Sequence, residues 1–255
     1  MKNLVWGVVA TVLASAPTAH AYQVGREYDG AYDSERTALA VYHPDGTWTG
    51  SSAAKEERAA LSLAKLYLGY YVLNHGTDEE KNLVEYMITY SDDGYAEILD
   101  ETYPEAIDSV AADFDLEDTY RNESWGRSVT SAYDVAKFVA SILSDSSARP
   151  LIDGMRNQSE TASDGFHQVF GTALLKNAEG TKTGWSNDEE SETGSVSFGS
   201  SGMETWVAAA LTNGDAAANT ADALRGIDEA AEFNPWKPGD RLAVSLSTKE
   251  ILRRL

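Results

Sequence analysis

The sequence predicts a mixed α/β (α+β) fold, in which strands from both ends of the chain form one sheet and a helical lobe is inserted between them. Segments that alternate apolar and polar side chains occur near the start and in the last third of the chain. The residues between them follow helical periodicity instead. Because the strands must share one core, the stretch from about 66 to 175 is expected to be the inserted lobe, with a pocket at its junction with the sheet.

The first residues have the pattern of a secretory signal. Lys2 precedes an apolar run, and Ala19-His20-Ala21 forms a small-residue cleavage site. The run is too short to span a bilayer, no later segment is long enough to be an anchor, and without cysteine there is neither a disulfide nor a lipid-modified cysteine. We therefore expect a signal peptide at 1–21, a secreted or extracytoplasmic domain at 22–233 with no stable membrane anchor, and a C-terminal tail at 234–255.

The chain is strongly acidic, with a formal net charge of −21 at pH 7. Such a surface repels other polyanions at long range. Nucleic acid and anionic membranes are therefore not expected as partners, and the acidity is interpreted as a means of solubility outside the cell.

The strands are recognised by β-branched and aromatic residues between turn signals. The first two form a hairpin, because His43-Pro44-Asp45-Gly46 has the composition of a turn. The expected strands are Thr37–Tyr42, Thr47–Gly50, Thr181–Trp185, Gly194–Phe198 and Glu204–Thr212.

The helices are recognised by their apolar faces and end signals. The most apolar one, Ala59–Leu73, is expected to be buried in the middle of the domain and to end at Asn74-His75-Gly76. Pro104 divides the helical stretch from Gly94 to Val110. The other expected elements are a helix at Asp78–Met87 with Leu83, Tyr86 and Met87 facing inward, a polar loop at Phe114–Arg127 that carries Trp125, a helix at Thr130–Leu143 capped by Ser128 or Thr130, and a helix at Ala216–Phe233.

Two polar side chains interrupt the first turn of the buried helix. Ser62 and Lys65 are three residues apart and therefore share a helical face. A hydroxyl with a desolvated amine in reach describes a nucleophile and its base. The alternative is an N-cap serine and a lysine that extends to solvent. A second S-x-x-K, Ser52 to Lys55, lies in a polar stretch and shows that the spacing alone is weak.

Two further motifs follow in the chain. Ser91-Asp92-Asp93 ends a helix, and Lys182-Thr183-Gly184 lies on a strand. Taken singly, each motif has a structural alternative. Ser91 could be an ordinary turn residue, and Lys182 could be an ordinary charge on an edge strand.

Together, in this order on helix, loop and strand, the three motifs resemble the signature of the penicillin-binding-protein and serine β-lactamase superfamily. The chain is similar to class A β-lactamase-type proteins, in particular to uncharacterised secreted members from actinobacteria. Thr130 with Asp134, and Phe170-Gly171, extend the likeness, which covers roughly Thr37 to Asn213. The resemblance implies a five-stranded antiparallel sheet flanked by helices, an all-helical lobe, and an active site between them.

The resemblance also implies the catalytic roles. Ser62 would attack an amide carbonyl to form an acyl-enzyme, Lys65 would take its proton, and Ser91 would relay a proton to the leaving nitrogen. The backbone N–H groups of Ser62 and Trp185 would form the oxyanion hole.

The remaining motif residues are assigned to substrate binding. Lys182 would attract a substrate carboxylate and Thr183 would donate a hydrogen bond to it, with Gly184, Trp185 and Asp93 beside them. No cofactor is implied, and no metal, since the histidines lack metal-ligand spacing.

Two departures from the family pattern bear on activity. The second motif usually ends in asparagine, whereas Asp93 offers only acceptors when ionised and would raise the pKa of Lys65. The stretch from Leu116 to Thr130 lacks the E-x-x-L-N motif that supplies the deacylating glutamate of class A β-lactamases. Glu123 or Glu117 could replace that glutamate, although loop carboxylates are usually only solvated.

The sequence therefore predicts an exported acyl-serine hydrolase that acts on D-alanyl peptides of the peptidoglycan stem, or on β-lactam amides, through a Ser62 acyl-enzyme. One alternative is a class A-like β-lactamase with a degenerate deacylation loop. The other is a catalytically silent relative that binds peptidoglycan.

Overall fold

Strands from both ends of the described chain pair in one antiparallel sheet, as the sequence predicts. The computed structural model describes residues 34–43, 46–201 and 204–232; the expected signal peptide and C-terminal tail lie outside these ranges. The five strands run in the order β2-β1-β8-β7-β6, so the two ends of the sequence meet where β1 pairs with β8. Their bounds are β1 Thr37–Tyr42, β2 Trp48–Gly50, β6 Ala178–Trp185, β7 Thr193–Ser201 and β8 Glu204–Thr212.

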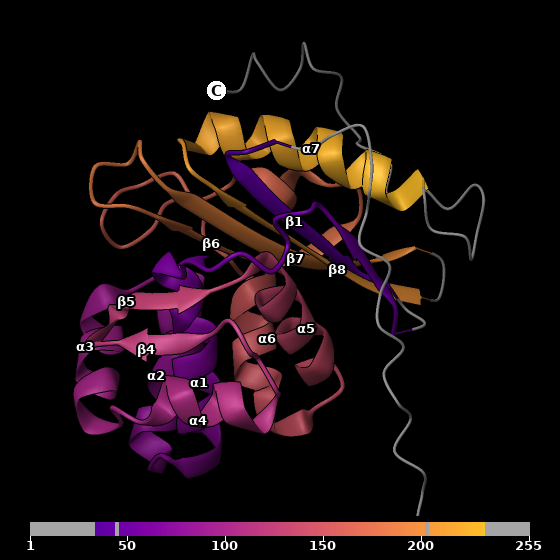
Figure 1. Cartoon of the computed structure of the whole chain (residues 1–255). Helices are drawn as coiled ribbons and strands as arrows, with labels where there is room; N and C mark the ends of the chain where they lie inside the picture. The colour runs from indigo at the N-terminus through magenta and orange to yellow at the C-terminus, as the bar shows by residue number, and fades with distance from the viewer. Residues whose placement is uncertain (1–33, 44–45, 202–203, 233–255) are drawn as a thin grey trace, which may run out of the picture.

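Both faces of the sheet are covered. Successive side chains of a strand point to opposite sides, and here each set is buried in a different apolar cluster. On β1, Leu39 and Val41 join the apolar cluster beneath α7 (Ala216–Glu232), whereas Ala38 and Ala40 join the larger cluster shared with the helical lobe. Figure 1 shows this arrangement, with α7 above the sheet and the lobe below it. The sheet therefore forms a wall between one helix and the lobe.

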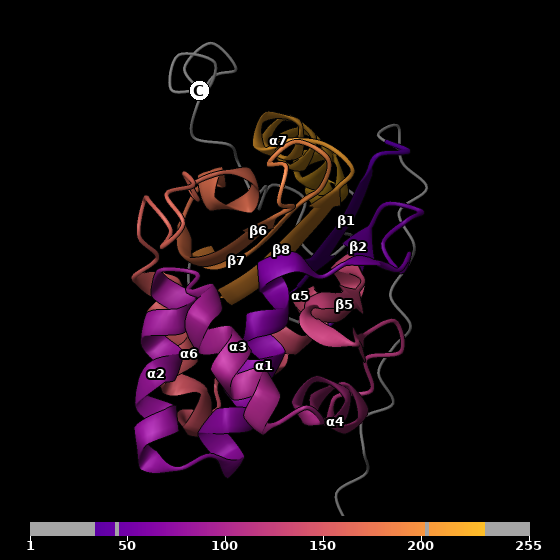
Figure 2. The same cartoon turned by 90° about the vertical axis from the view of Figure 1, so that its left-hand side faces the viewer.

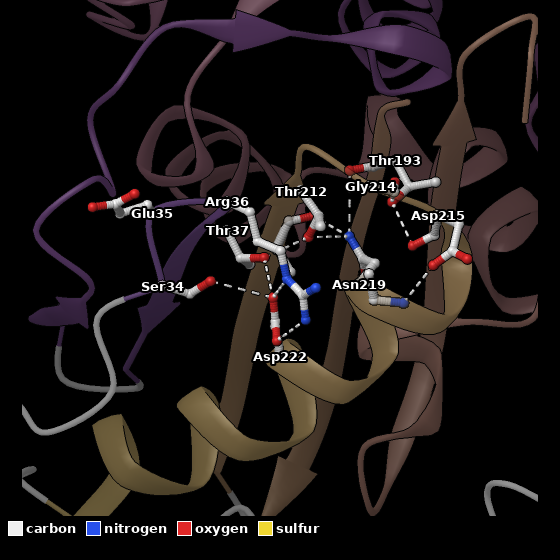
Figure 3. Close-up of polar contacts among 12 residues, drawn as sticks. Ser34, Glu35, Arg36, Thr37, Thr193, Thr212, Gly214, Asp215, Asn219 and Asp222 are labelled. Carbon is white, nitrogen blue, oxygen red and sulfur yellow. Dashed lines mark hydrogen bonds and ion pairs between the residues drawn. The ribbon is translucent and has the colours of Figure 1, made fainter. Parts of the chain in front are cut away.

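Buried polar contacts fix α7 on its face of the sheet (Figure 3). Asp222 of α7 accepts hydrogen bonds from Arg36 at 2.6 and 2.8 Å and from Thr37 Oγ1 at 2.6 Å. Asn219, one turn earlier, donates to Thr212 Oγ1 at 3.1 Å. Because these partners belong to β1, β8 and the residue before β1, the network joins the two termini of the domain.

The lobe is built around α1, which has α2, α4 and α6 packed against it (Figure 2). Most of its side chains are buried, including Tyr67, which is fully enclosed. No helix within the described ranges is long and apolar enough to cross a membrane. The helices of the lobe are α1 Ala64–His75, α2 Asp78–Thr89, α3 Asp93–Thr102, α4 Ala106–Asp113, α5 Ala132–Ile142 and α6 Arg149–Arg156, with short 3₁₀ turns η1 Leu61–Leu63 and η2 Ser146–Ala148. A third turn, η3 Gly171–Leu174, packs against α7 on the other face of the sheet, so the lobe ends before the predicted residue 175.

The buried helix begins later than the sequence predicts. Arg58–Ala59 form a short strand, β3, and the 3₁₀ turn η1 separates it from α1. Arg58 pairs with Thr130 across the two strands, so the backbone of this segment is hydrogen-bonded to a distant part of the chain and not to a helical turn. The apolar composition is the same in either case, which is why periodicity placed the start too early.

The expected polar loop at Phe114–Arg127 is wrong. This segment contains β4 (Tyr120–Asn122) and leads into β5 (Ser124–Thr130), and the two strands pair as a hairpin in a second sheet of order β3-β5-β4. Much of the hairpin is exposed, so its strands need no apolar alternation and give no sequence signal.

The hairpin also changes the expected cap of α5. Ser128 and Thr130 belong to β5, and the helix is capped by Ser131, whose hydroxyl accepts a hydrogen bond from the Asp134 N–H at 3.1 Å. On α2, Tyr86 is exposed, contrary to expectation, while Val84 and Ile88 are buried.

Candidate active site

Ser62 and Lys65 lie where the sequence places them, at the start of the buried helix. Ser62 is in the 3₁₀ turn η1 and Lys65 in the first turn of α1. The Lys65 ammonium donates to Ser62 Oγ at 2.7 Å and is itself inaccessible to solvent. Ser62 caps neither helix, and Lys65 does not extend to solvent, so the structural alternatives for both residues are wrong. In the second S-x-x-K, by contrast, both Ser52 and Lys55 are exposed.

The backbone around Ser62 is held in an unusual conformation by its neighbours. Leu61 has a φ of +52°, a left-handed value that costs a non-glycine residue about 1 kcal/mol. Gly184 of β6 lies directly against this turn: a Cβ on it would be 2.7 Å from the Ser62 backbone nitrogen. Only glycine allows the strand and the Ser62 turn to come this close.

Ser91 connects the two lysines of the motifs. It lies between α2 and α3 with a φ of +53°, and its hydroxyl accepts from Lys182 Nζ at 2.9 Å and lies 3.4 Å from Lys65 Nζ. Its carbonyl accepts a further hydrogen bond from Lys65 at 3.0 Å. The three motifs, far apart in the sequence, therefore converge; we call Ser62, Lys65, Ser91 and Lys182 the floor of the site.

Lys182 and Thr183 are fully buried behind Ser91. Lys182 Nζ also donates to the carbonyl of Thr183 at 2.6 Å, and Thr183 Oγ1 donates to the carbonyl of Gln168 at 3.0 Å. The two groups that the resemblance assigns to a substrate carboxylate thus already have partners within the protein.

Asp93 places a carboxylate against the floor. It is the first residue of α3, and its Oδ1 accepts from Lys65 Nζ at 2.5 Å while 67% of the side chain stays exposed. Its neighbour Asp92 caps the helix by accepting from the Tyr95 N–H at 2.9 Å. The position after the cap is therefore free to face Lys65.

Burial and charge act on the pKa of Lys65 in opposite directions. Burial lowers this pKa from its ordinary value, and the Asp93 carboxylate raises it, with burial the stronger of the two. The sequence predicted the contribution of Asp93 but not that burial would exceed it. The pKa of Lys182 is lowered further, by complete burial and then by the charge of Lys65.

The β4–β5 hairpin places an indole over the floor. Asp100 of α3 is buried and accepts from the guanidinium of Arg121 through both oxygens, each at 2.8 Å, and from the Trp125 N–H at 3.1 Å. This clamp holds the Trp125 ring with its centroid 4.4 Å from Lys65 Nζ, within cation–π range. Asp100 and Arg121 were not predicted from the sequence, because neither lies in a motif.

A second aromatic residue, Trp185, stands at the end of β6. Its ring stacks on Phe166 with 4.4 Å between centroids, and its Nε1 donates to Asp164 Oδ2 at 3.0 Å. Phe166 and Asp164 belong to the α6–η3 connection, residues 157–170. Neither residue was predicted from the sequence to belong to the site.

These parts enclose a cleft of about 1140 Å³. Ser62, Asp93, Trp125 and Trp185 line it, whereas Lys65, Lys182 and Thr183 are fully buried and Ser91 is 5% exposed. The upper walls, which we call the rim, come from the exposed side of α3, the β4–β5 hairpin, the α6–η3 connection and the β6–β7 turn. Eight carboxylates but only two guanidinium groups line the cleft.

The two candidate deacylating glutamates differ in position. Glu123 lies in the turn of the hairpin, lines the cleft, is exposed, and accepts a hydrogen bond from Arg127. Glu117 lies in a separate hollow of about 350 Å³ and does not line the cleft. Of the two, only Glu123 shares the cleft with Ser62.

The described histidines and carboxylates form no metal centre. Within the described ranges, no group of three or more His, Asp or Glu side chains could hold a metal ion. His43, for example, is buried and hydrogen-bonds Thr49 Oγ1 at 2.8 Å.

Solved structures with a similar fold include class A β-lactamases. That of the last common ancestor of Gram-negative bacteria is 19% identical, with a TM-score of 0.60 over 74% of this chain and 89% of that one. The β-lactamase of Sphaerobacter thermophilus is 16% identical, with a TM-score of 0.58 over 73% of this chain and 87% of that one. L2 in complex with relebactam is 18% identical, with a TM-score of 0.57 over 74% of this chain and 87% of that one.

No protein-family model matches the chain, and no curated protein does. At these identities the structural likeness shows the fold. The chain has the fold of the serine β-lactamase and penicillin-binding-protein superfamily, as its motifs predicted.

Proposed function

We propose that this protein is an exported acyl-serine hydrolase, which acts on D-alanyl peptide or β-lactam amides through an ester on Ser62. The observation that carries the proposal is the buried Lys65 amine, 2.7 Å from Ser62 Oγ at the bottom of an open cleft. The similarity of the fold to class A β-lactamases supports the same class of reaction.

Acylation begins with Lys65 in its neutral form. The Lys65 amine takes the proton of Ser62 as Oγ bonds to the amide carbonyl carbon. The backbone N–H groups of Ser62 and Trp185 hold the resulting oxyanion. Ser91, in contact with both lysines, passes a proton to the leaving nitrogen, the C–N bond breaks, and the acyl group remains on Ser62.

Lys65 must first lose a proton, and its contacts set the cost. An ammonium has three N–H donors, and Ser62 Oγ, the Ser91 carbonyl and Asp93 Oδ1 can accept all three. Burial favours the neutral amine, whereas Asp93 favours the ammonium. Asp93 therefore slows acylation without preventing it.

Deacylation is the slower half of the reaction in this proposal. It needs a base that directs water to the ester, and Glu123 is exposed and ion-paired with Arg127. A long-lived ester with a β-lactam is expected of a peptidase, whereas an efficient β-lactamase hydrolyses that ester quickly. The position of Glu123 on the cleft nevertheless favours one second candidate, a class A-like β-lactamase with a degenerate deacylation loop.

The reaction is tested by the mass of the intact protein during incubation with a penicillin and with a D-alanyl-D-alanine peptide. A peptidase gives a persistent penicillin adduct that a Ser62→Ala variant lacks. A β-lactamase gives a transient adduct and steady consumption of the drug. A protein that forms no adduct and cleaves neither compound is the catalytically silent peptidoglycan-binding relative, and that result would refute the proposal.

Export is a separate part of the proposal and has its own test. The N-terminal pattern supports cleavage after Ala21. The full chain, expressed in a bacterium with a general secretion system, should appear outside the cytoplasm with Tyr22 as its first residue. Retention in the cytoplasm with Met1 intact would contradict it.

A further inference from the structure

The groups that would receive a substrate carboxylate are closed off in this protein. Lys182 and Thr183 are fully buried, and neither lines the cleft. The Thr183 hydroxyl proton is directed to the Gln168 carbonyl, and Lys182 Nζ donates to Ser91 Oγ and to the Thr183 carbonyl. A ligand carboxylate in the cleft would have to displace these contacts to reach either group.

Near these buried groups, an acidic side chain lines the cleft instead. Asp164 is exposed, lines the cleft, and accepts from Trp185 Nε1 at 3.0 Å. The same indole has its ring centroid 6.0 Å from Lys182 Nζ, so one side chain, at the residue after Gly184, contacts Asp164 and lies near Lys182. The position is a fixed one, because Phe166, two residues later, stacks on Trp185.

The segment that carries Asp164 is anchored beside the floor. The Ser163 N–H donates to the Tyr90 carbonyl at 2.8 Å, and its hydroxyl donates to Asp92 Oδ2 at 3.0 Å. Asp164 therefore follows a residue that is bound to the Ser91 loop from two sides. Its charge contributes to the electrostatics of both lysines, raising the pKa of each against the effect of burial.

The rest of the cleft is also negatively charged. Both guanidinium groups that line it are already paired, Arg121 with Asp100 and Arg127 with Glu123. Four other lining carboxylates, those of Glu97, Glu101, Glu189 and Glu192, form no ion pair with another described residue. The cleft therefore offers an incoming ligand a negative wall and buried cations.

We propose that the site selects cationic acyl donors, namely amides that carry an ammonium group and no carboxylate beside the scissile bond, and that Asp164 is the residue that excludes the carboxylate. This proposal rests on the proposed function, since it assigns a substrate class to the same Ser62 chemistry. It departs from the carboxylate-binding role that the motif resemblance assigns to Lys182 and Thr183, and it narrows the proposed substrates: a D-alanyl peptide whose leaving D-alanine carries a free carboxylate would acylate Ser62 slowly.

The test is a charge series of probes that share one reactive ring. Benzylpenicillin carries a carboxylate, its methyl ester is neutral, and ampicillin methyl ester carries an ammonium group and no carboxylate. The second-order rate of Ser62 acylation, followed by intact mass at low ionic strength, is expected to rise about tenfold at each step, the order of magnitude for one unscreened charge contact near a protein surface. Added salt should reduce the differences between the three acylation rates.

The Asp164→Asn variant measures the contribution of the Asp164 charge to this series. In this variant the methyl ester should lose most of its advantage over benzylpenicillin, whereas the step from the neutral to the cationic probe should remain. Asp113→Asn, an equal change of charge at the exposed end of α4, should leave all three rates unchanged.

The outcomes separate this proposal from the function on which it rests. If no probe labels Ser62, the acyl-serine function is wrong and the substrate class falls with it. If benzylpenicillin labels Ser62 faster than its methyl ester, the function stands and the charge selection is overturned. An Asp164→Asn series identical to that of the parent protein would overturn the role of Asp164.

Discussion

The floor and the rim of the cleft are built in opposite ways. On the floor, Lys65 and Lys182 are inaccessible to solvent, and each is hydrogen-bonded to Ser91. On the rim, carboxylates such as Glu97 and Glu189 are exposed. The difference indicates that the chemistry depends on packing and desolvation, whereas the choice of ligand depends on surface charge that a single substitution can change without unfolding the protein.

The largest effect is expected at Lys65, the proposed general base on the floor. Lys65→Met removes the amine and keeps the length of the side chain, so the rate of Ser62 acylation should fall at least about 100-fold, the usual contribution of a general base. The matched control is Lys55→Met in the exposed second S-x-x-K, which should acylate at the parent rate. A Lys65→Met variant that keeps the parent rate would remove the base from the mechanism.

The next largest effect is expected where the sheet meets the Ser62 turn. In Gly184→Ala the new Cβ would lie 2.7 Å from the Ser62 nitrogen, so the backbone must move. Acylation should fall about tenfold and the free energy of unfolding by about 1–3 kcal/mol.

The control is Gly126→Ala on the hairpin. An added Cβ there has no atom within 4 Å. Equal losses in the two glycine variants, measured by acylation rate and urea denaturation, would show that the close approach at Gly184 is not what positions Ser62.

Asp93 joins the two regions, since it is exposed like the rim but contacts the floor. Asp93→Asn should speed acylation by the neutral methyl ester probe roughly threefold to tenfold, because removing the carboxylate lowers the pKa of Lys65. More of the lysine is then neutral at a given pH, so the ascending limb of the pH–rate profile should move to lower pH.

A second rim carboxylate serves as the control for this shift. Glu101→Gln removes one charge from the cleft but has no ion pair with Lys65, so the ascending limb should stay in place. No gain in rate for Asp93→Asn, or a limb that moves to higher pH, would refute the opposing role of Asp93.

The smallest effect on acylation is expected at Asp134, below the hairpin. It accepts from Thr119 Oγ1 and from the Asp118 N–H, both at 2.8 Å, and burial raises its pKa to about 6. A raised pKa means that the folded state binds the proton more tightly than the unfolded state. The resulting stabilisation is complete below about pH 4 and is lost as pH rises to about 6, by up to roughly 3 kcal/mol.

Urea denaturation of the parent and of Asp134→Asn at a series of pH values measures this linkage. Relative to the variant, the parent should be more stable at pH 4 than at pH 7, while acylation of folded protein should change little. A stability difference that is independent of pH would show that Asp134 does not titrate between these values.

The sequence predicted the floor well because its residues lie in short motifs on strongly patterned elements. The strand at Thr37–Tyr42 has the predicted bounds, and Ser62, Ser91 and Lys182 converge as the motif order required. The roles given to these residues, and to Thr183, Gly184, Trp185 and Glu123, remain predictions.

The rim could not be predicted in the same way. Its β4–β5 hairpin is exposed, so pairing within the chain and the clamp of Asp100 on Arg121 fix it without apolar alternation. Asp164 gives no local signal either, since its position depends on the indole of Trp185, which is distant in the sequence. Contacts of this kind appear only when the fold brings the segments together.

Both proposals depend on acylation of Ser62, and peptide mapping after incubation with ampicillin methyl ester identifies the acylated residue. Opening of a β-lactam ring loses no atoms, so the full mass of the probe is expected on the peptide that contains Ser62. No such adduct should form in Ser62→Ala. A probe mass found on the peptide that contains Ser52 but not Ser62, or an adduct that persists in Ser62→Ala, would contradict it.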